Sequence, residues 1–144
     1  MITALNHPIS VCLWFNGQAK EAASFYCSVF QHSKITTETP MVVTFELNGN
    51  KFMGLNGGPA FQFNEAISFV VNCDTQEEID YYWSKLSEDG EEGRCGWLKD
   101  RFGVSWQIVP TILGQLMSDA KKAERVGTTL LQMKKLNIEK LTQA

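Results

Sequence analysis

Few residues in this sequence have the types and spacing that metal binding requires. A metal site needs His, Cys, Asp or Glu side chains brought together. The chain has 2 histidines, His7 and His32, and no HExxH or HxH motif. The 4 cysteines are far apart and form no CxxC pair: Cys12, Cys27, Cys73 and Cys95. We therefore expect surface histidines, buried free thiols and no metal centre.

Two other segments could suggest chemistry, and both have simpler interpretations. The acidic group at 88–92 surrounds the expected end of a helix and a glycine turn, which predicts a solvated loop rather than paired catalytic carboxylates. The glycine-rich segment 54–58 precedes Pro59 and a strand, whereas glycine loops that bind phosphate stand before a helix. We therefore expect a turn there. No GxSxG motif marks a nucleophilic serine.

The composition indicates one soluble domain with an ordinary core. The chain has 144 residues, of which 44% are hydrophobic, and a net charge of −3. This balance predicts no nucleic-acid partner, because such proteins need a clustered basic face. No apolar run approaches the roughly 20 residues that span a bilayer, so no membrane association is expected. Residues 1–8 lack the pattern of a secretory signal, and the expected location is the cytoplasm.

The order strand, helix and further strands occurs twice along the chain. Alternation and β-branched residues predict strands at 9–15, 33–40, 42–47 and 51–55, and helical spacing predicts a helix at 18–30. In the second half strands are predicted at 66–73, 94–98 and 104–109. A helix is predicted to begin after Thr75, because Thr75 and Glu78 have capping-box spacing. This helix is expected to end near Gly90. The two halves therefore resemble two modules of similar length.

The last part of the chain, 111–144, has helical patterns and no strand signal. Ser118 and Asp119 could cap a helix whose apolar stripe contains Val126 and Leu130. A lone helix of this length is marginally stable in water. We therefore expect this tail to dock on its own domain or on a second copy of the chain.

Alternation along the predicted strands separates two sheet faces. On the first strand Trp14 shares a face with Cys12, and on the last strand Trp106 shares a face with Ile108. If the face of these tryptophans packs the helices, the opposite face combines apolar and polar residues, which is typical of a small-molecule pocket. Its members are Val11, Leu13, Phe15, Ser68, Val70, Ser105 and Gln107. A plain core with a few satisfied polar groups has the same pattern.

Three sequence blocks carry a resemblance to a known family. They are CLWFNGQAKEAASFY at 12–26, ISFVVNCDTQEEIDYYWSKLS at 67–87 and CGWLKDRFGVSWQIVP at 95–110. Together with QMKKLNIEKL at 132–141 they resemble the PhnB-like branch of the vicinal oxygen chelate superfamily, which includes glyoxalase I, bleomycin-resistance proteins and extradiol dioxygenases. The resemblance implies an α+β fold in which paired βαβββ modules form an eight-stranded cup-shaped mixed sheet.

The resemblance also implies a domain organisation and an oligomeric state. Residues 1–110 would form a single glyoxalase/bleomycin-resistance-like domain with modules at about 1–59 and 60–110. Residues 111–144 would be the helical tail. The usual assembly in this superfamily is a homodimer, and dimer formation would close the cups.

Catalytic members of the superfamily hold a divalent metal through His and Glu residues on four strands. The matching places in this chain are Val11, the segment 53–55, Ala66 or Ser68, and Gln107. None of these is a good metal ligand, so no metal and no other cofactor are expected. The branch also carries a 3-demethylubiquinone methyltransferase-like label, and the sequence contains no motif for S-adenosylmethionine.

Three functional interpretations remain open. The first is a metal-free small-molecule-binding protein, in which Phe15, Trp97 and Gln107 form pocket walls and Gln107 orients a polar ligand group. The second is an enzyme of lyase, isomerase, dioxygenase or methyltransferase-like type, which uses other metal ligands or acts through Cys95, Arg94 or Lys99. The third is a dimeric interaction protein whose cup is filled by side chains.

Overall fold

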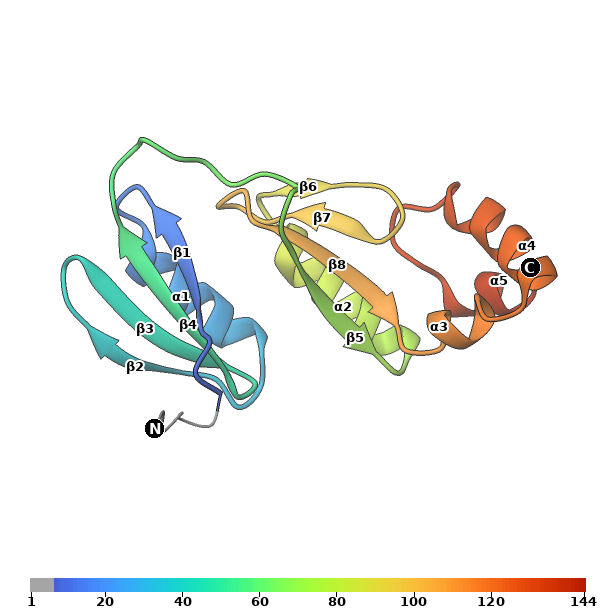
Figure 1. Ribbon diagram of the computed structural model, residues 1–144, viewed down its shortest axis with the longest axis horizontal. Helices are drawn as coiled ribbons and strands as arrows, with labels where there is room; N and C mark the ends of the chain where they lie inside the picture. The colour runs from blue at the N-terminus through green and yellow to red at the C-terminus, as the bar shows by residue number, and fades with distance from the viewer. Residues whose placement is uncertain (1–6) are drawn as a thin grey trace, which may run out of the picture. The chain divides into compact units, whose positions relative to one another are not determined.

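The order of strands and helices expected in both halves is present in the computed structural model, which describes residues 7–144 (Figure 1). The chain divides into two compact units, and the boundary lies between Gln62 and Phe63. Each unit contains one four-stranded mixed sheet and the helix of its strand–helix–strand module, and the second unit also contains the three helices of the tail. The α+β class, the two strand–helix–three-strand modules and the helical tail are therefore confirmed.

The first unit contains one helix and four strands: β1 (Val11–Phe15), α1 (Ala19–Val29), β2 (Lys34–Glu38), β3 (Val42–Leu47) and β4 (Asn50–Asn56). The sheet order is β1-β4-β3-β2, with β1 parallel to β4 and the other pairs antiparallel. The β3–β4 turn has positive φ at Asn48 (49°) and Gly49 (84°), as a tight hairpin requires.

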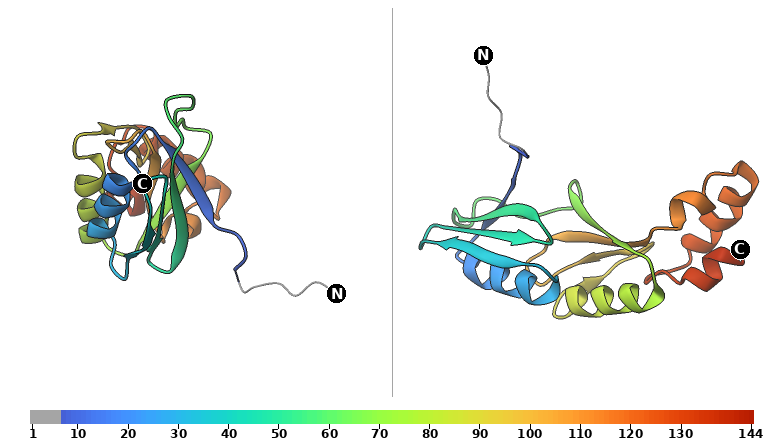
Figure 2. Two further views of the ribbon diagram at one scale, coloured as in Figure 1. Left: turned by 90° about the vertical axis from the view of Figure 1, so that its left-hand side faces the viewer. Right: turned by 90° about the horizontal axis from the view of Figure 1, so that it is seen from below.

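Small residues allow α1 to pack closely on this sheet. Ala19, Ala22 and Ala23 are fully buried on the inner face of the helix. A Cβ atom at Gly54 of β4 would lie only 3.0 Å from the Cβ of Ala19. The start of α1 is also tied to the sheet, because the side-chain oxygen Oδ1 of Asn56 accepts a hydrogen bond from the Ala19 N–H (2.9 Å). Figure 2 shows α1 along one face of the sheet.

The second unit repeats this topology with β5 (Ser68–Cys73), α2 (Gln76–Ser87), β6 (Glu91–Glu92), β7 (Trp97–Lys99) and β8 (Ser105–Pro110). Its sheet order is β5-β8-β7-β6, and β5 is parallel to β8. The predicted cap of α2 is confirmed, because the Thr75 side chain accepts a hydrogen bond from the Glu78 N–H (3.2 Å).

Two predictions for this unit need correction. The acidic segment is not only a loop, because Glu91 and Glu92 form the short edge strand β6 and pair with β7. The strand predicted at 94–98 begins at Trp97. The preceding residues Cys95 and Gly96 have positive φ (58° and 85°), which interrupts an extended strand.

A buried carboxylate organises the turn between β7 and β8. Asp100 is only 3% exposed. Its Oδ1 accepts hydrogen bonds from the Phe102 N–H (2.8 Å) and the Val104 N–H (3.0 Å), and its Oδ2 accepts one from the indole N–H of Trp106 (2.9 Å). These bonds compensate for burial of the carboxylate and hold Trp106 on the inner side of the sheet.

The tail forms three short helices, α3 (Leu113–Leu116), α4 (Ala120–Leu130) and α5 (Ile138–Thr142). Asp119 caps α4, since its side chain accepts a hydrogen bond from the Lys121 N–H (3.2 Å). The helices enclose a small apolar core of Leu116, Val126, Leu136 and Leu141. None of the helices described over residues 7–144 is long and apolar enough to cross a membrane.

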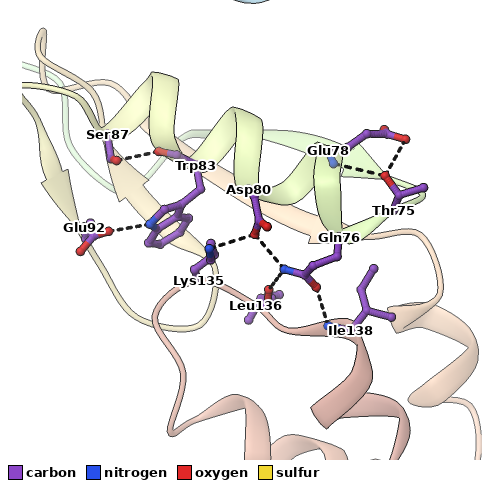
Figure 3. A network of polar contacts seen from close by, with 10 residues as sticks. All are labelled: Thr75, Gln76, Glu78, Asp80, Trp83, Ser87, Glu92, Lys135, Leu136 and Ile138. Carbon is purple, nitrogen blue, oxygen red and sulfur yellow. Dashed lines mark hydrogen bonds and ion pairs between the residues drawn. The ribbon is translucent and has the colours of Figure 1, made fainter.

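Side chains on α2 attach this tail to the second unit (Figure 3). The Gln76 amide donates to the Leu136 carbonyl (3.0 Å) and accepts from the Ile138 N–H (2.8 Å). Asp80 accepts a hydrogen bond from the Gln76 amide (3.0 Å) and forms an ion pair with Lys135 (2.9 Å). The tail therefore docks on its own unit, and the side chain of Gln76 binds two backbone groups of the tail, the Leu136 carbonyl and the Ile138 N–H.

Acidification should loosen this attachment. Hydrogen bonds from Lys135 and Gln76 hold the pKa of Asp80 below its ordinary value. The contribution of Asp80 to stability is therefore fully present above the ordinary aspartate pKa of about 4 and is lost as the pH falls through the lowered value. In an NMR titration, the side-chain amide signals of Gln76 should shift with a midpoint below about 4. Asp80→Asn should abolish that shift, and Glu77→Gln should retain it. If the Gln76 signals of Asp80→Asn still shift with the same midpoint, Asp80 is not the group that titrates.

Candidate functional site

The candidate site lies on the helix-free face of the second sheet, which we call the open face. Strand pairing aligns Ser68, Ser105 and Lys99 in one row across β5, β8 and β7, and Val70, Gln107 and Trp97 in the next. The alternate residues on β7 and β8, among them Leu98, Trp106 and Ile108, are buried on the side of α2. The condition under which the opposite face could form a pocket, that the Trp106 face packs on the helix, is therefore met in this unit.

A hydrogen-bonded pair occupies the middle of the open face. The side-chain amide of Gln107 donates to the Ser68 hydroxyl oxygen (2.9 Å). Trp97 is half-buried in the same row as Gln107, and Val70, on the other side of Gln107, is 49% exposed. The Gln107 carbonyl oxygen Oε1 accepts no hydrogen bond from the described residues, so it can accept one from a ligand. The arrangement combines apolar area with a polar group of fixed orientation.

A small hollow adjoins this pair at Ser105. Its volume is about 130 Å³, and it is lined by Glu65, Glu91, Glu92, Gly93, Trp97, Leu98, Lys99 and Ser105. Glu65 and Lys99 form an ion pair at its mouth. Their mutual hydrogen bond lowers the pKa of Glu65 and raises that of Lys99, so both groups stay charged near neutral pH. Of the predicted site residues, Ser68, Trp97, Ser105 and Gln107 are thus brought together.

In the first unit the faces are reversed relative to the sequence expectation. Leu13 and Phe15 are 6% and 2% exposed and lie on the side of α1, with Phe15 against Gly54. Val11 is half-buried and shares their side of β1. Leu13 and Phe15 are therefore core residues, which corrects their assignment to a pocket wall. The physical reason is the close approach of α1, which small residues permit only on this side.

Trp14 lies on the helix-free side of β1 and is covered by the segment that follows β4. Its indole N–H donates to the Gly58 carbonyl (2.9 Å), and its ring makes an edge contact with Phe61 at a centroid distance of 4.9 Å. A Cβ atom at Gly57 would lie 2.2 Å from the Trp14 ring. The turn expected at 54–58 lies later in the chain, because Gly54 belongs to β4 and the turn is formed by Pro59 and Ala60, while Gly57 and Gly58 pack on Trp14.

Sequence reasoning missed a second hollow, on the helix-free face of the first sheet. Its volume is about 350 Å³, and it is lined by Ser10, Thr36, Thr44, Phe45, Glu46, Lys51, Phe52 and Met53. The hydroxyls of Thr36 and Thr44 are hydrogen-bonded across β2 and β3 (2.7 Å). Alternation along 42–47 places Thr44 on the sheet face opposite Val43 and Phe45, and this pattern could have indicated a polar position on the helix-free face.

The residues present do not fit a divalent metal ion. Within residues 7–144, no three His, Cys, Asp or Glu side chains come together in a group that could hold one. Both histidines lie away from the strands: His7 is exposed before β1, and His32 is exposed between α1 and β2. Ser68 and Gln107, which lie on strands where the resemblance implies metal ligands, are hydrogen-bonded to each other.

The cysteines differ from one another in exposure. All four are free thiols, but only Cys73 is buried, whereas Cys12 is exposed. Burial, followed by the nearby charges of Glu78 and Asp74, raises the pKa of Cys73 to about 11, so this thiol stays protonated at neutral pH. The expectation of buried thiols is therefore correct for Cys73 and wrong for Cys12, which lies on the helix-free side of the edge strand β1.

Comparison with known proteins relates this architecture to a family. The family model described as 3-demethylubiquinone-9 3-methyltransferase matches residues 7–109. A PhnB protein from Bacillus cereus is 35% identical, with 72% of this chain and 98% of that chain covered and a TM-score of 0.66. Comparison with curated protein sequences found no match.

More distant solved structures share the fold. A protein from Pseudomonas aeruginosa is 22% identical, with 71% of this chain and 96% of that chain covered and a TM-score of 0.60. The fosfomycin resistance protein FosX from Listeria monocytogenes, solved with Mn(II) and sulfate, is 13% identical, with 81% of this chain and 97% of that chain covered and a TM-score of 0.59. On the match to the family model and to the Bacillus protein, this chain belongs to the 3-demethylubiquinone-9 3-methyltransferase family, the PhnB-like branch of the vicinal oxygen chelate superfamily.

Proposed function

We propose that this protein binds a small organic molecule on the open face of its second sheet, without a metal ion. The observation that carries the proposal is the Gln107–Ser68 hydrogen bond, which holds a polar group in a fixed orientation beside Trp97. A binding site of this kind needs apolar area for affinity and a few placed polar groups for orientation. The open face has both.

Each residue of the pair contributes a separate function. Ser68 fixes the amide plane of Gln107 by accepting its N–H, and the Gln107 carbonyl oxygen is then directed to a ligand donor. Trp97 and the exposed side chain of Val70 supply apolar area on either side. A ligand with a flat apolar part and an N–H or O–H donor matches this surface.

The chemistry of the side chains supports binding without a metal ion. The places that the resemblance matches to metal ligands in the second unit hold Ala66 or Ser68 and Gln107, and none of these is a strong ligand for a divalent transition metal. Methyl transfer, which the family's name describes, finds no support in the glycine segment, because Gly57 and Gly58 pack on Trp14 and lead to β5 rather than to a helix.

Replacing Gln107 by alanine should weaken ligand binding without unfolding the protein. Benzamide is a suitable probe, because its ring can stack on Trp97 and its amide can donate to Gln107. In a titration followed by the indole N–H signal of Trp97, Gln107→Ala should weaken benzamide binding about fivefold, the value of one hydrogen bond of about 1 kcal/mol. Asn72→Ala is the matched control, because Asn72 is exposed on the same face of β5. Equal affinity of the two variants would remove the role of Gln107.

Protein purified without chelators should contain no stoichiometric transition metal. The physical reason is the absence of any cluster of three metal-binding side chains in the described part of the chain. Elemental analysis measures zinc, nickel, iron and manganese per chain, and one equivalent of any of them would overturn the metal-free proposal.

We also expect the protein to form a homodimer in the cytoplasm. Several large apolar side chains are strongly exposed in the single chain, including Ile67 (74%) in the second unit. A second copy that covered such residues would gain hydrophobic free energy. Light scattering of the purified protein should give twice the mass of one chain, and the mass of a single chain at micromolar concentration would contradict the expectation.

A further inference from the structure

One segment of the tail, 133–138, is hydrogen-bonded to the turn that precedes β7, and we call this segment the strap. The Met133 carbonyl accepts a hydrogen bond from the Cys95 N–H, and the Lys134 carbonyl accepts one from the Gly96 N–H, each at 2.8 Å. The strap lies beyond the part of the chain that the family model matches. An element outside the family's matched region therefore binds a turn next to the proposed binding surface.

The conformation of this turn, 94–97, needs outside support. The Trp97 N–H closes the turn by donating to the Arg94 carbonyl (3.0 Å). Its two central residues, Cys95 and Gly96, have positive φ (58° and 85°). This region is unfavourable for a residue with a Cβ atom such as Cys95, and it persists where the surrounding structure holds it. The strap supplies that support, because its carbonyls bind the N–H groups of both central residues.

Leu136 connects the turn to the apolar core of the tail. A Cβ atom at Gly96 would lie 3.1 Å from Cδ1 of Leu136 and 3.0 Å from the carbonyl oxygen of Ile108 on β8. Leu136 is itself fully buried in the tail core. Gly96 is thus enclosed between the tail and β8, and no larger residue fits there. A displacement of Leu136 would therefore be passed to the turn.

Helix α2 fixes the other side of the strap (Figure 3). The Gln76 side chain binds the Leu136 carbonyl and the Ile138 N–H, and Asp80 forms an ion pair with Lys135. Helix α2 also packs on β7 and β8. The strap is therefore held between a helix of the sheet's own core and the turn before β7.

Trp97 is the side chain whose position depends on this turn. It is the first residue of β7, which is only 3 residues long and pairs on one side with the 2-residue strand β6. Few ladder hydrogen bonds can therefore fix it. On the other side Trp97 is aligned with Gln107 of β8 in the open face. The turn that the strap holds thus sets how Trp97 lies beside Gln107.

We propose that the strap is a positioning element for Trp97, so that docking of the tail and binding of a ligand on the open face strengthen each other. The inference rests on the proposed function and adds a regulation of that site. The strap acts through the turn and touches no ligand. By linkage, the factor by which the docked tail raises ligand affinity equals the factor by which a bound ligand stabilises docking.

The first test releases the strap from positions outside the open face. Gln76→Ala combined with Leu136→Ala removes the clamp on α2 and the packing on the turn. In the ligand-free full chain, the indole N–H signal of Trp97, assigned with Trp97→Phe, should shift. Benzamide binding should weaken about fivefold, the lower end of typical coupling between sites. Glu77→Ala is the matched control, because Glu77 is the exposed neighbour of Gln76 on α2, and it should leave both measurements unchanged.

The second test needs no variant. In the unaltered protein, saturating benzamide should slow hydrogen exchange of the Cys95 and Gly96 amides, which the strap binds, by the same factor of about five. The control is the Thr111 amide, which donates to the Cys73 carbonyl at the far end of β8 (2.8 Å). Equal slowing at Thr111 would show only a general stabilisation of the unit and would contradict the coupling, as would no slowing at all.

The outcomes separate the inference from the proposed function. If the double variant exchanges the Cys95 and Gly96 amides rapidly, so that the strap is released, and the Trp97 signal and benzamide affinity are unchanged, the inference fails and the proposed function stands. If benzamide does not bind the unaltered protein, the proposed function fails, and the Trp97 signal of the ligand-free variant decides whether the strap positions Trp97. If the double variant does not fold, the exchange measurement decides.

Discussion

In each unit a single helix packs on one face of a four-stranded sheet, and the opposite face has no helix of that unit on it (Figure 2). The other properties of the molecule depend on this constraint. The covered face carries the apolar core, so its residues are large and buried. The open face can carry polar residues, because these residues keep access to water or to a ligand. Candidate ligand-binding groups are therefore confined to alternate positions of the strands. Which face the helix covers decides which of these side chains are accessible to a ligand.

Close packing of the helix decides which face of the sheet is covered. In the first unit Ala19 and Gly54 allow α1 to approach the sheet on the side of Phe15, and Trp14 is left on the other side, where the segment after β4 covers it. In the second unit Asp100 binds the indole of Trp106 and holds it on the side of α2. Trp14 of β1 and Trp106 of β8 thus lie on opposite sides of their sheets relative to the helix of each unit. Their hydrogen-bond partners also differ, a carbonyl in one case and a carboxylate in the other.

Buried polar groups in the second unit are of two kinds, those compensated within the fold and one that is not. Asp100 binds two backbone N–H groups and an indole, so its burial is compensated within the fold. Ser105, five positions later, is equally buried and has no partner in the described part of the chain. The adjacent Gln107–Ser68 pair makes the same strand, β8, the centre of the proposed binding surface.

The sequence by itself determined the elements and their order, because alternation, helical spacing, capping residues such as Thr75 and turn residues such as Gly49 act over a few neighbouring positions. It also placed Ser68, Ser105 and Gln107 on one face. Only the tertiary structure decided that Leu13 and Phe15 belong to the core, because alternation separates two faces without showing which one a helix covers. The attachment of the tail was equally beyond local patterns, since Gln76 binds Leu136 across 60 positions of the chain. The hollow beside Ser105 was also beyond local patterns, because its lining residues come from three strands and from the segment before β5.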